Sequence, residues 1–402
     1  MKGMNDQHIA ERAMLHRRAL HAIPEAGLDL PDTIAYVRRT IGATGFKAVD
    51  CGGGLVVDIG CEGPLVAMRA DMDGLPITEE TGLPFASAHH GMMHACGHDA
   101  HTGALLACAE AYSASPPEGF RVRLLFQPGE EGWFGARPMI AAGCLDGVSA
   151  IVGGHVGNLS EELEPGQAGF MPGPMMASSD MFEGAFVGSG GHGAAPHQAR
   201  DPIPALAEFV MSLQAFRNRA PDQRKPFVVS VCELSAGSTY NVIPGEARFK
   251  GTARTLEPFE RALARTGIER VCAGVAAVHG LGHGFTWIEG YPPLTNDAKA
   301  TGIAMEAVAG VLGQVDARTM TIPSMGGEDF AFYLARVPGC FWFFNTQSPE
   351  KGIVHPNHHP RFDVDDSLLG CFAQANMAAA EALARAYPEV PIGSGASGNN
   401  GL

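Results

Sequence analysis

The densest group of metal-capable side chains in the sequence lies between residues 93 and 101. This stretch reads Met-His-Ala-Cys-Gly-His-Asp-Ala-His. Thiolate, imidazole and carboxylate groups are ligands that Zn²⁺, Mn²⁺, Co²⁺ and Ni²⁺ accept, and Gly97 lets the backbone turn so that Cys96 and His98 can face one ion. The alternative is a surface histidine cluster beside a buried cysteine, because a free cysteine usually behaves as a small core residue. The density of ligands favours a metal site.

Two aspartates follow a predicted strand upstream of this stretch. The apolar run 65–68 predicts a β-strand, and Asp71 and Asp73 come just after it. In open α/β sheets the carboxyl ends of the strands form the edge where ligands bind. A carboxylate that accepts a hydrogen bond from a metal-bound histidine fixes the tautomer and orientation of the ring. We therefore expect Asp71 and Asp73 to orient a histidine ligand at this edge.

A pair of adjacent glutamates, Glu130 and Glu131, follows another predicted strand at 122–126. Adjacent carboxylates repel, and a site tolerates this repulsion when one group binds a cation and the other titrates. That arrangement suits hydrolysis, since a water with a metal-lowered pKa needs a nearby carboxylate to take its proton and pass it to the leaving amine. Glu130 is the candidate general base and Glu131 the candidate ligand.

Length and composition restrict the possible classes of protein. A chain of 402 residues with 46% hydrophobic content is expected to form two domains. A formal net charge of −15 argues against binding to nucleic acid or to anionic lipid. The sequence contains neither a long uninterrupted apolar run nor an apolar signal core near its start, so no membrane segment and a cytoplasmic location are expected. The scattered cysteines lack a CxxC pair and are expected to be reduced thiols.

Hydrophobic periodicity predicts an α/β protein with an inserted domain. Helices are expected at 9–22, 32–39 with Asp32 as the N-cap, 98–112, 137–142, 203–215, 258–278, 298–312 and 366–386, and strands at 55–59, 65–68, 122–126, 150–154, 181–187, 227–234, 247–252 and 285–289. From residue 179 the order is β-α-β-β-α-β, the split βαβ arrangement. The predicted domains are a discontinuous catalytic domain, 1–178 with 293–402, and a lid domain, 179–292. The Gly-, Ser- and Asn-rich tail 393–402 is expected to be disordered.

Four other segments join the stretch 93–101 in an order typical of a known family. They are Arg69 to Pro76, Phe126 to Gly132, Gly154-His155 and His358 to Phe362. Together they resemble the metallopeptidase family that contains the aminoacylases and carboxypeptidase G. The similarity is greatest to its amidohydrolase branch of hippurate hydrolases, N-acyl-amino-acid deacylases and hydrolases of auxin–amino acid conjugates. The resemblance implies a zinc-exopeptidase-like mixed-sheet catalytic domain with an inserted α+β, ferredoxin-like lid that also serves dimerisation.

The resemblance also implies a set of metal ligands, and it agrees with Glu130 as the base. The implied ligands are Cys96, His98, Glu131, His155 and His358. Such a set suits one or two divalent ions per subunit; a thiolate favours Zn²⁺, Co²⁺ or Ni²⁺, and the resemblance adds Mn²⁺. The neighbouring His359 makes the register of the last ligand ambiguous, and the Pro-Arg-Phe that follows matches the family pattern better with His358. Other histidines are expected to be bystanders: His94, His101 and His355.

A glycine-rich segment in the predicted lid surrounds His192. It resembles a phosphate-binding loop only superficially, because it lacks the Lys-Ser/Thr ending. The family resemblance instead equates His192 with a lid histidine that reaches the active site of a partner subunit and stabilises the tetrahedral oxyanion. The alternative is a structural histidine in a turn. The resemblance thus implies a homodimer, or a higher homo-oligomer, formed through the lid.

Asn241 and Arg254 resemble residues that bind the α-carboxylate of the substrate, for which the planar fork of arginine is suited. Gly326 and Gly327 allow backbone to approach the substrate closely, and exposed loop structure is the alternative for all of these. The leading hypothesis is metal-dependent hydrolysis of the amide bond of a small N-acyl amino acid, with aromatic acyl groups among the candidates. The alternatives are hydrolysis of another C–N bond, such as that of an aromatic amine, and a non-catalytic metal-binding protein. The presence of Glu130 argues against a non-catalytic metal-binding protein, because metal binding alone does not require this residue.

Overall fold

The computed structural model describes residues 6–313 and 316–388, so the predicted disordered tail 393–402 lies outside the described residues. The chain forms two compact units. Of the described residues, unit 1 comprises 6–173, 295–313, 316–323 and 329–388, and unit 2 comprises 174–294 and 324–328. The expected domain boundaries put residues 324–328 with the first domain, whereas in the structure they group with unit 2.

Unit 1 is built on an eight-stranded sheet with the order β1-β2-β4-β3-β5-β16-β6-β15. Its strands are β1 (Val49–Cys51), β2 (Gly54–Ile59), β3 (Leu65–Asp71), β4 (Arg121–Gln127), β5 (Val148–Val156), β6 (Ala168–Phe170), β15 (Ala317–Thr319) and β16 (Gly339–Phe344). Strand β3 pairs parallel with β4 and β5, and β16 pairs parallel with β5, while β2 pairs antiparallel with β1 and β4. The expected mixed sheet is confirmed. Strands β3, β5 and β16 are buried along their whole length, as expected where both faces of a sheet are covered.

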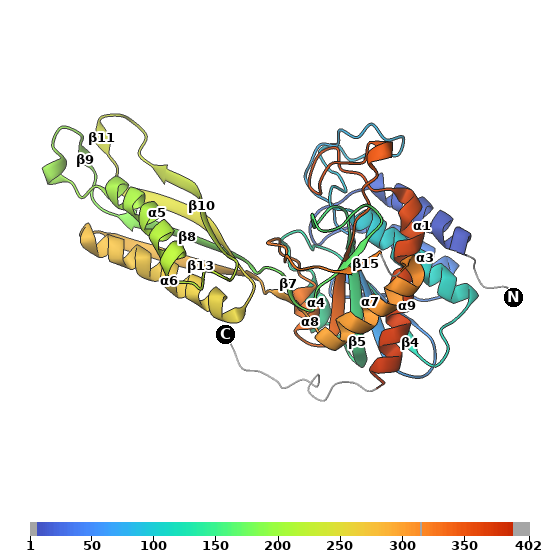
Figure 1. Cartoon of the computed structure of the whole chain (residues 1–402). Helices are drawn as coiled ribbons and strands as arrows, with labels where there is room; N and C mark the ends of the chain where they lie inside the picture. Colours follow the sequence, from blue (N-terminus) through green and yellow to red (C-terminus); the bar gives the residue numbers. More distant parts are fainter. Residues whose placement is uncertain (1–5, 314–315, 389–402) are drawn as a thin grey trace. The chain divides into compact units, whose positions relative to one another are not determined.

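Helices cover this sheet. They are α1 (Asp6–His21), α2 (Pro31–Ala43), α3 (His98–Ala114), α4 (Ala136–Ala141), α7 (Ala298–Leu312), α8 (Ala331–Leu334) and α9 (Leu369–Ala386), with the 3-10 turns η2 (Pro349–Lys351) and η3 (Asp366–Leu368). Helices α1, α3 and α9 pack against one another (Figure 1). Gly103 permits the close approach of α1 to α3, because a Cβ added there would lie 2.7 Å from the backbone nitrogen of Arg17. Helix α3, which begins at His98, is thereby packed closely against α1.

The prediction that Asp32 caps the second helix is wrong. Leu30 is the N-cap residue of α2, and Pro31 occupies the first helical position, where its fixed φ suits a helix start. The side chain of Glu25 accepts hydrogen bonds from the backbone N–H groups of Asp32 (3.2 Å) and Thr33 (2.9 Å). A residue from the preceding loop therefore satisfies two of the free N–H groups in the first turn of α2.

Unit 2 has a four-stranded antiparallel sheet with the order β10-β12-β8-β13. Its elements are β8 (Ser179–Val187), β9 (Gly191–His192), η1 (Pro196–Gln198), α5 (Pro202–Arg219), β10 (Phe227–Ala236), β11 (Val242–Ile243), β12 (Glu246–Thr255), α6 (Pro258–Val278) and β13 (Gly282–Tyr291), and the short strands β7 (Gly173–Met176) and β14 (Leu294–Asn296) lie where the chain passes between the units. The predicted β-α-β-β-α-β order and ferredoxin-like sheet are confirmed. Phenylalanines from the sheet and from α5, among them Phe186, Phe209 and Phe249, form the core of this unit.

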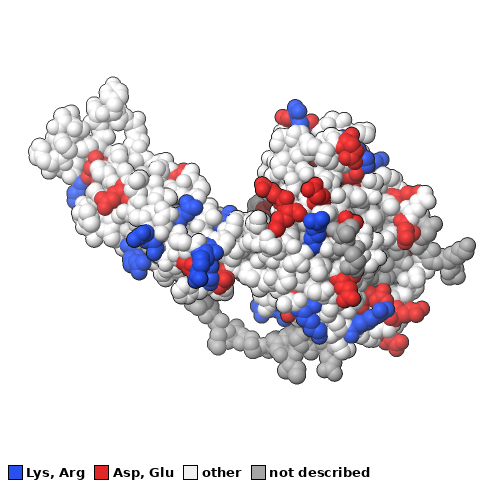
Figure 2. Space-filling view, in the orientation of Figure 1, with Lys and Arg blue, Asp and Glu red and all other residues white. Residues whose placement is uncertain are grey.

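On the face shown in Figure 2, acidic and basic side chains of unit 1 are interspersed rather than gathered in a basic patch. Within the ranges that the structure describes, no helix combines the length and the apolar character needed to cross a bilayer.

Candidate metal centre

The strand ends and one helix start of unit 1 carry the predicted site residues. Asp71 is the last residue of β3, and His155 is the penultimate residue of the buried strand β5. His98 opens α3 directly after Gly97, which has a positive φ of 93°. A Cβ at Gly97 would lie 2.7 Å from a methyl carbon of Val156. Glycine is therefore required at this position, both for the conformation and for the close approach of α3 to β5.

Cys96, His98 and His155 form a buried group whose potential ligand atoms all lie within 4.8 Å of one another. The Sγ atom of Cys96 is 3.4 Å from Nε2 of His155. Nδ1 of His155 lies 2.8 Å from the carbonyl oxygen of Val156, to which it can donate only when it carries the proton. That hydrogen bond leaves the lone pair on Nε2, which faces Cys96 and is suited to bind a metal.

Glu131 and His358 complete the predicted ligand set. Oε1 of Glu131 lies 3.0 Å from Nε2 of His358, and both residues group with Cys96 within the same 4.8 Å limit. The segment that carries His358 is held by a hydrogen bond from its backbone N–H to the carbonyl of Ala95 (2.6 Å). His358 has a positive φ of 68°, a strained conformation of the kind that concentrates at functional sites. The structure thus brings all the predicted ligands together.

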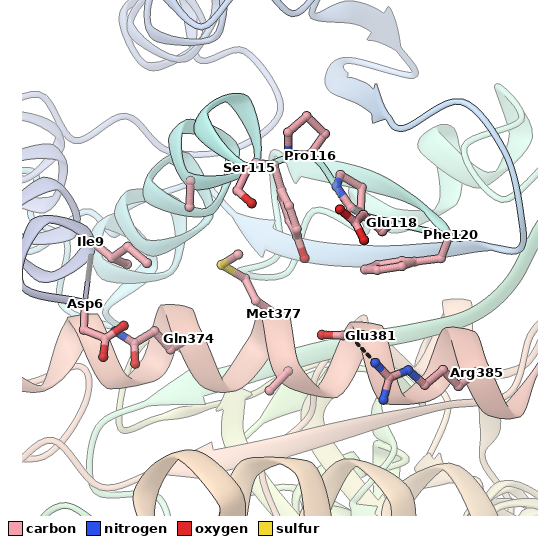
Figure 3. Close-up of a pocket in the computed structure, with 14 residues that line it drawn as sticks. Asp6, Ile9, Ser115, Pro116, Glu118, Phe120, Gln374, Met377, Glu381 and Arg385 are labelled. Carbon is pink, nitrogen blue, oxygen red and sulfur yellow. Dashed lines mark hydrogen bonds and ion pairs between the residues drawn. The ribbon is translucent and has the colours of Figure 1, made fainter. Parts of the chain in front are cut away.

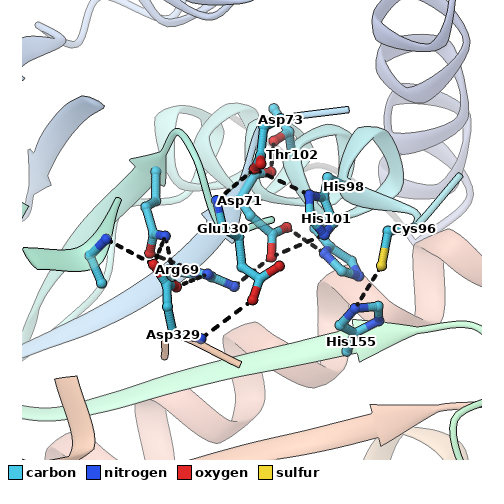
Figure 4. A network of polar contacts seen from close by, with 12 residues as sticks. Arg69, Asp71, Asp73, Cys96, His98, His101, Thr102, Glu130, His155 and Asp329 are labelled. Carbon is cyan, nitrogen blue, oxygen red and sulfur yellow. Dashed lines mark hydrogen bonds and ion pairs between the residues drawn. The ribbon is translucent and has the colours of Figure 1, made fainter. Parts of the chain in front are cut away.

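Asp73 and Asp71 approach opposite edges of the His98 ring (Figure 4). Oδ1 of Asp73 lies 3.4 Å from Nδ1, and Oδ2 of Asp71 lies 3.6 Å from Nε2. Asp73 has a second contact that the sequence did not predict, since it accepts the backbone N–H groups of Glu130 (2.9 Å) and Glu131 (3.0 Å). One aspartate therefore positions a histidine and both glutamates of the site.

The donor set fits a divalent cation. Both ring nitrogens of His98 are buried and have no hydrogen-bond partner among the residues that the structure describes. Although burial opposes the charged form, the carboxylates of Asp71 and Asp73 raise the pKa of His98 to about 10. Burial, together with Glu131 and Glu130, raises the pKa of the Cys96 thiol well above its usual range. A divalent cation reverses both effects, because it neutralises the carboxylates and stabilises a thiolate.

His101, which was expected to be a bystander, contacts Asp71 and the backbone of β5. Its Nδ1 lies 2.6 Å from Oδ1 of Asp71, and its Nε2 accepts the backbone N–H of Val156 at 2.9 Å. The second bond puts the proton on Nδ1, so His101 donates to Asp71 and holds that carboxylate toward His98. The signal in the sequence is the spacing from His98 to His101, which places both rings on one face of a helix.

An arginine-centred network that the sequence did not predict holds Asp71 and the loop near Glu130 (Figure 4). Arg69 donates to Asp71 (2.5 Å), to the side-chain oxygen of Gln127 (3.0 Å) and to Asp329 (2.9 Å). The backbone N–H of Asp329 in turn lies 3.4 Å from Oε1 of the buried Glu130. Burial raises the pKa of Asp329 to about 6, with Arg69 and Gln127 opposing the rise. The fold thus fixes Glu130 from its backbone and from its side chain.

The remaining predicted residues belong to unit 2: His192, Asn241, Arg254, Gly326 and Gly327. His192 and Asn241 lie together there, since β9 pairs with β11 through His192 and Val242, and the carbonyl of Asn241 accepts the N–H of Gly193 at 2.9 Å. Both side chains are exposed. Arg254 is half-buried, and its Nη1 donates to the carbonyl oxygens of Asp180 (3.3 Å) and Ala253 (3.2 Å).

A cavity of about 550 Å³ lies away from this cluster, at the opposite end of α3 (Figure 3). It is lined by residues of α1, the end of α3, the segment between α3 and β4, and α9, including Ile9, Ser115, Phe120, Met377 and Glu381. None of the predicted site residues lines it. The chemistry of the donor atoms, rather than the size of a cavity, therefore locates the candidate site.

Comparisons with known proteins agree with this geometry. The model of the peptidase family M20/M25/M40 matches residues 67–380. An N-acetylcysteine deacetylase of Bacillus subtilis is 37% identical over 92% of this chain and 96% of its own length. An N-acyl-L-amino acid amidohydrolase of Geobacillus stearothermophilus is 40% identical over 70% of this chain and 76% of its own length. The crystal structure of a dinuclear metal-binding peptidase of the M20 family from Bacillus subtilis superposes with a TM-score of 0.79 and 34% identity, over 94% of this chain and 98% of that one. The family model covers most of the chain, and the donor set lies within the matched residues. This chain therefore belongs to the peptidase family M20/M25/M40.

Proposed function

We propose that this protein hydrolyses the amide bond of small N-acyl amino acids and releases a carboxylic acid and an amino acid. The observation that carries the proposal is the position of Glu130, a buried carboxylate whose backbone N–H is fixed by Asp73 beside the ligand candidate Glu131. A metal-binding protein without hydrolytic activity would not need a second carboxylate held in this way. The names of the relatives, which describe deacetylation of N-acetylcysteine and hydrolysis of N-acyl amino acids, support this substrate class.

The proposed division of roles follows the contacts. Cys96, His98, Glu131, His155 and His358 would hold one or two divalent ions. The thiolate favours Zn²⁺, Co²⁺ or Ni²⁺, and the resemblance to the family adds Mn²⁺ as a candidate. When bound, such ions lower the pKa of water and polarise the amide carbonyl. A carboxylate oxygen of Glu130 takes the proton of the attacking water, holds it, and donates it to the nitrogen of the leaving amine. Asp73 and Asp71 keep the ring of His98 in place.

Substrate recognition is assigned to unit 2. Arg254 would pair with the α-carboxylate through the nitrogens of its planar fork, while its Nη1 is anchored on backbone carbonyls. Asn241 would add an amide donor, and Gly326 and Gly327 would let backbone approach the substrate. The exposed His192, next to Asn241 across β9 and β11, would stabilise the oxyanion in the site of a partner subunit.

These roles imply a homodimer, or a higher homo-oligomer, formed through unit 2 as the lid and dimerisation domain, with unit 1 as the catalytic domain. We place the enzyme in the cytoplasm, where a reducing environment keeps thiols free. All of its cysteines are unpaired, and Cys96 needs a reduced sulfur to bind a metal.

The test combines metal analysis with a panel of substrates. Purified protein is stripped with a chelator, reloaded with each candidate ion, and assayed on N-acetyl, N-benzoyl and indole-acetyl amino acids, with dipeptides and aromatic amides for comparison. We expect activity to depend on reloading and to be highest on an N-acyl amino acid with a free α-carboxylate. Hydrolysis of dipeptides or aromatic amides alone would refute the substrate class, and metal-independent turnover would refute the mechanism.

A further inference from the structure

Arg17 is a buried arginine of α1 that lies outside the donor set, with only 1% of its surface exposed. Its Nε lies 3.3 Å from Oδ2 of Asp99, and its Nη1 donates to the carbonyl oxygen of Val364 at 3.3 Å. Its two terminal nitrogens also pair with the carboxylates of Asp363 and Asp366. One guanidinium therefore binds acceptors from two segments that are far apart in the sequence.

These two segments carry ligand candidates from opposite parts of the chain. Asp99 directly follows His98 in the first turn of α3. Asp363, Val364 and Asp366 follow His358 in the segment that leads into α9. Arg17 thus connects the start of α3, which presents His98 to the cluster, to the segment that presents His358.

His21, one turn further along α1, reinforces the first of these connections. Its Nδ1 lies 2.8 Å from the same Oδ2 atom of Asp99 that Arg17 contacts, and its Nε2 lies 3.2 Å from Glu79. Asp99 is therefore held by two cationic side chains of α1. On the other segment, the charge partner of Asp363 is Arg17.

We propose that Arg17 is a positioning residue that sets the distance between the His98 and His358 ends of the cluster and thereby determines the affinity for metal. The proposal rests on the ligand set assigned above. Its physical reason is that removing this buried cation leaves Asp363 without its charge partner, while Asp99 and Asp366 keep only His21 and Arg18. The carboxylates of the two segments then lose the cation that joins them, and they repel and draw in water. The segments of Asp99 and Asp363 would then separate, and the two ends of the donor set with them.

The experiment measures binding of Co²⁺ to metal-free protein, by the absorbance of thiolate-bound Co²⁺ and by calorimetry. We expect Arg17→Ala to weaken binding about 10- to 100-fold, the usual effect of removing a residue that orients metal ligands. Arg17→Lys keeps the charge but cannot reach acceptors on both segments with a planar fork, so it should restore only part of the affinity.

A chemical rescue separates positioning from a general loss of structure. A cavity of about 340 Å³ beside Arg17 is lined by Met14, Phe85 and Asp363, among others. Guanidinium at low millimolar concentration can enter through it and occupy the space vacated in Arg17→Ala. We expect guanidinium, but not tetramethylammonium, to restore Co²⁺ affinity.

Arg12 provides a matched control. It also joins α1 to α3, through a bidentate pair with Glu110 (2.7 Å), but it does so far along α3 from His98. Arg12→Ala should destabilise the helix pair and leave the affinity for Co²⁺ unchanged. If Arg17→Ala does not fold, Asp363→Asn, which loosens only the connection to the His358 segment, should show a smaller loss of affinity in the same direction.

The outcomes are distinct. The proposal is supported if the affinity for Co²⁺ falls in Arg17→Ala or Asp363→Asn and is retained in Arg12→Ala. Guanidinium should also restore the affinity of Arg17→Ala. Equal affinity in all variants, an equal loss in Arg12→Ala, or a loss in Arg17→Ala that guanidinium leaves unchanged overturns it. Failure of the unmodified protein to bind Co²⁺ at all would instead refute the proposed metal centre.

Discussion

Replacing Glu130 with glutamine separates chemistry from binding, because it removes the proton acceptor and keeps the shape of the side chain. The backbone N–H of Glu130 continues to donate to Asp73, since that bond (2.9 Å) does not involve the side chain. The amide oxygen of glutamine can replace Oε1 opposite the N–H of Asp329 (3.4 Å). We therefore expect Glu130→Gln to fold normally and to retain its metal.

The size of the effect follows from the role of the group. A positioned acid–base residue contributes a factor of about 10²–10⁴ to the rate, or about 3–5 kcal/mol of activation free energy. Glu130 is only 6% exposed, so bulk water cannot easily take over its function. We expect kcat to fall by at least about 10²-fold, with a much smaller change in KM.

The assay compares two adjacent substitutions. Turnover of an N-acetyl amino acid and metal content by atomic spectroscopy are measured for Glu130→Gln and Glu131→Gln. The first should lose activity and keep metal, whereas the second should lose both, because Glu131 pairs with His358 in the donor set. Near-normal turnover in Glu130→Gln would remove Glu130 from the mechanism, and loss of metal in that variant would make it a ligand instead.

Three other predictions test the site, the network beside it and the assembly. Cys96→Ala should lower metal stoichiometry and activity together, whereas Cys108→Ala, a buried thiol away from the donor set, should cost only packing; unchanged metal in the first would return Cys96 to the core. Burial opposes the charge of His21, but Asp99 and Glu79 raise its pKa from 6.5 to about 9, so its contribution to stability is complete below pH 6.5 and lost as the pH rises through 9. Urea unfolding of metal-free protein should show this loss, on the order of 3 kcal/mol, and a His21→Gln variant should lack it; equal pH profiles would contradict the assignment. Mixing inactive His192→Ala and Glu130→Gln proteins should restore some activity once subunit exchange is verified, because one site of the mixed dimer has both groups intact, and exchange without recovery would exclude a role in trans.

Much of unit 1 was predictable because its signals are local. Apolar runs that end in polar residues predicted β3, which ends at Asp71, and β4, which ends shortly before Glu130, and the sheet then brings these strand ends to one edge. The helix that begins at His98 was predicted from the spacing of its apolar residues. These features depend on near neighbours in the sequence, so they can be inferred without knowledge of the tertiary fold.

Other features depend on contacts between distant residues. The carboxylate of Asp73 holds the backbone of Glu130 and Glu131, an acceptor role that no spacing in the sequence indicates. Arg17 and Asp366 pair across 349 positions. The wrong cap at Asp32 has the same origin, since Glu25 reaches the helix start through a loop whose course only the tertiary structure defines.

The partners of the buried carboxylates distinguish framework from metal site. Asp329 pairs with Arg69, and Asp99 with Arg17, and because arginine does not give up its proton the cationic side of each pair is permanent. Glu131 and Asp73 instead face the rings of His358 and His98, whose nitrogens can bind a metal. A divalent cation can therefore bind between these side chains without disturbing the arginine pairs. The carboxylates paired with arginine thus keep the strand and helix ends in place, and metal binding depends on the carboxylates that face histidine.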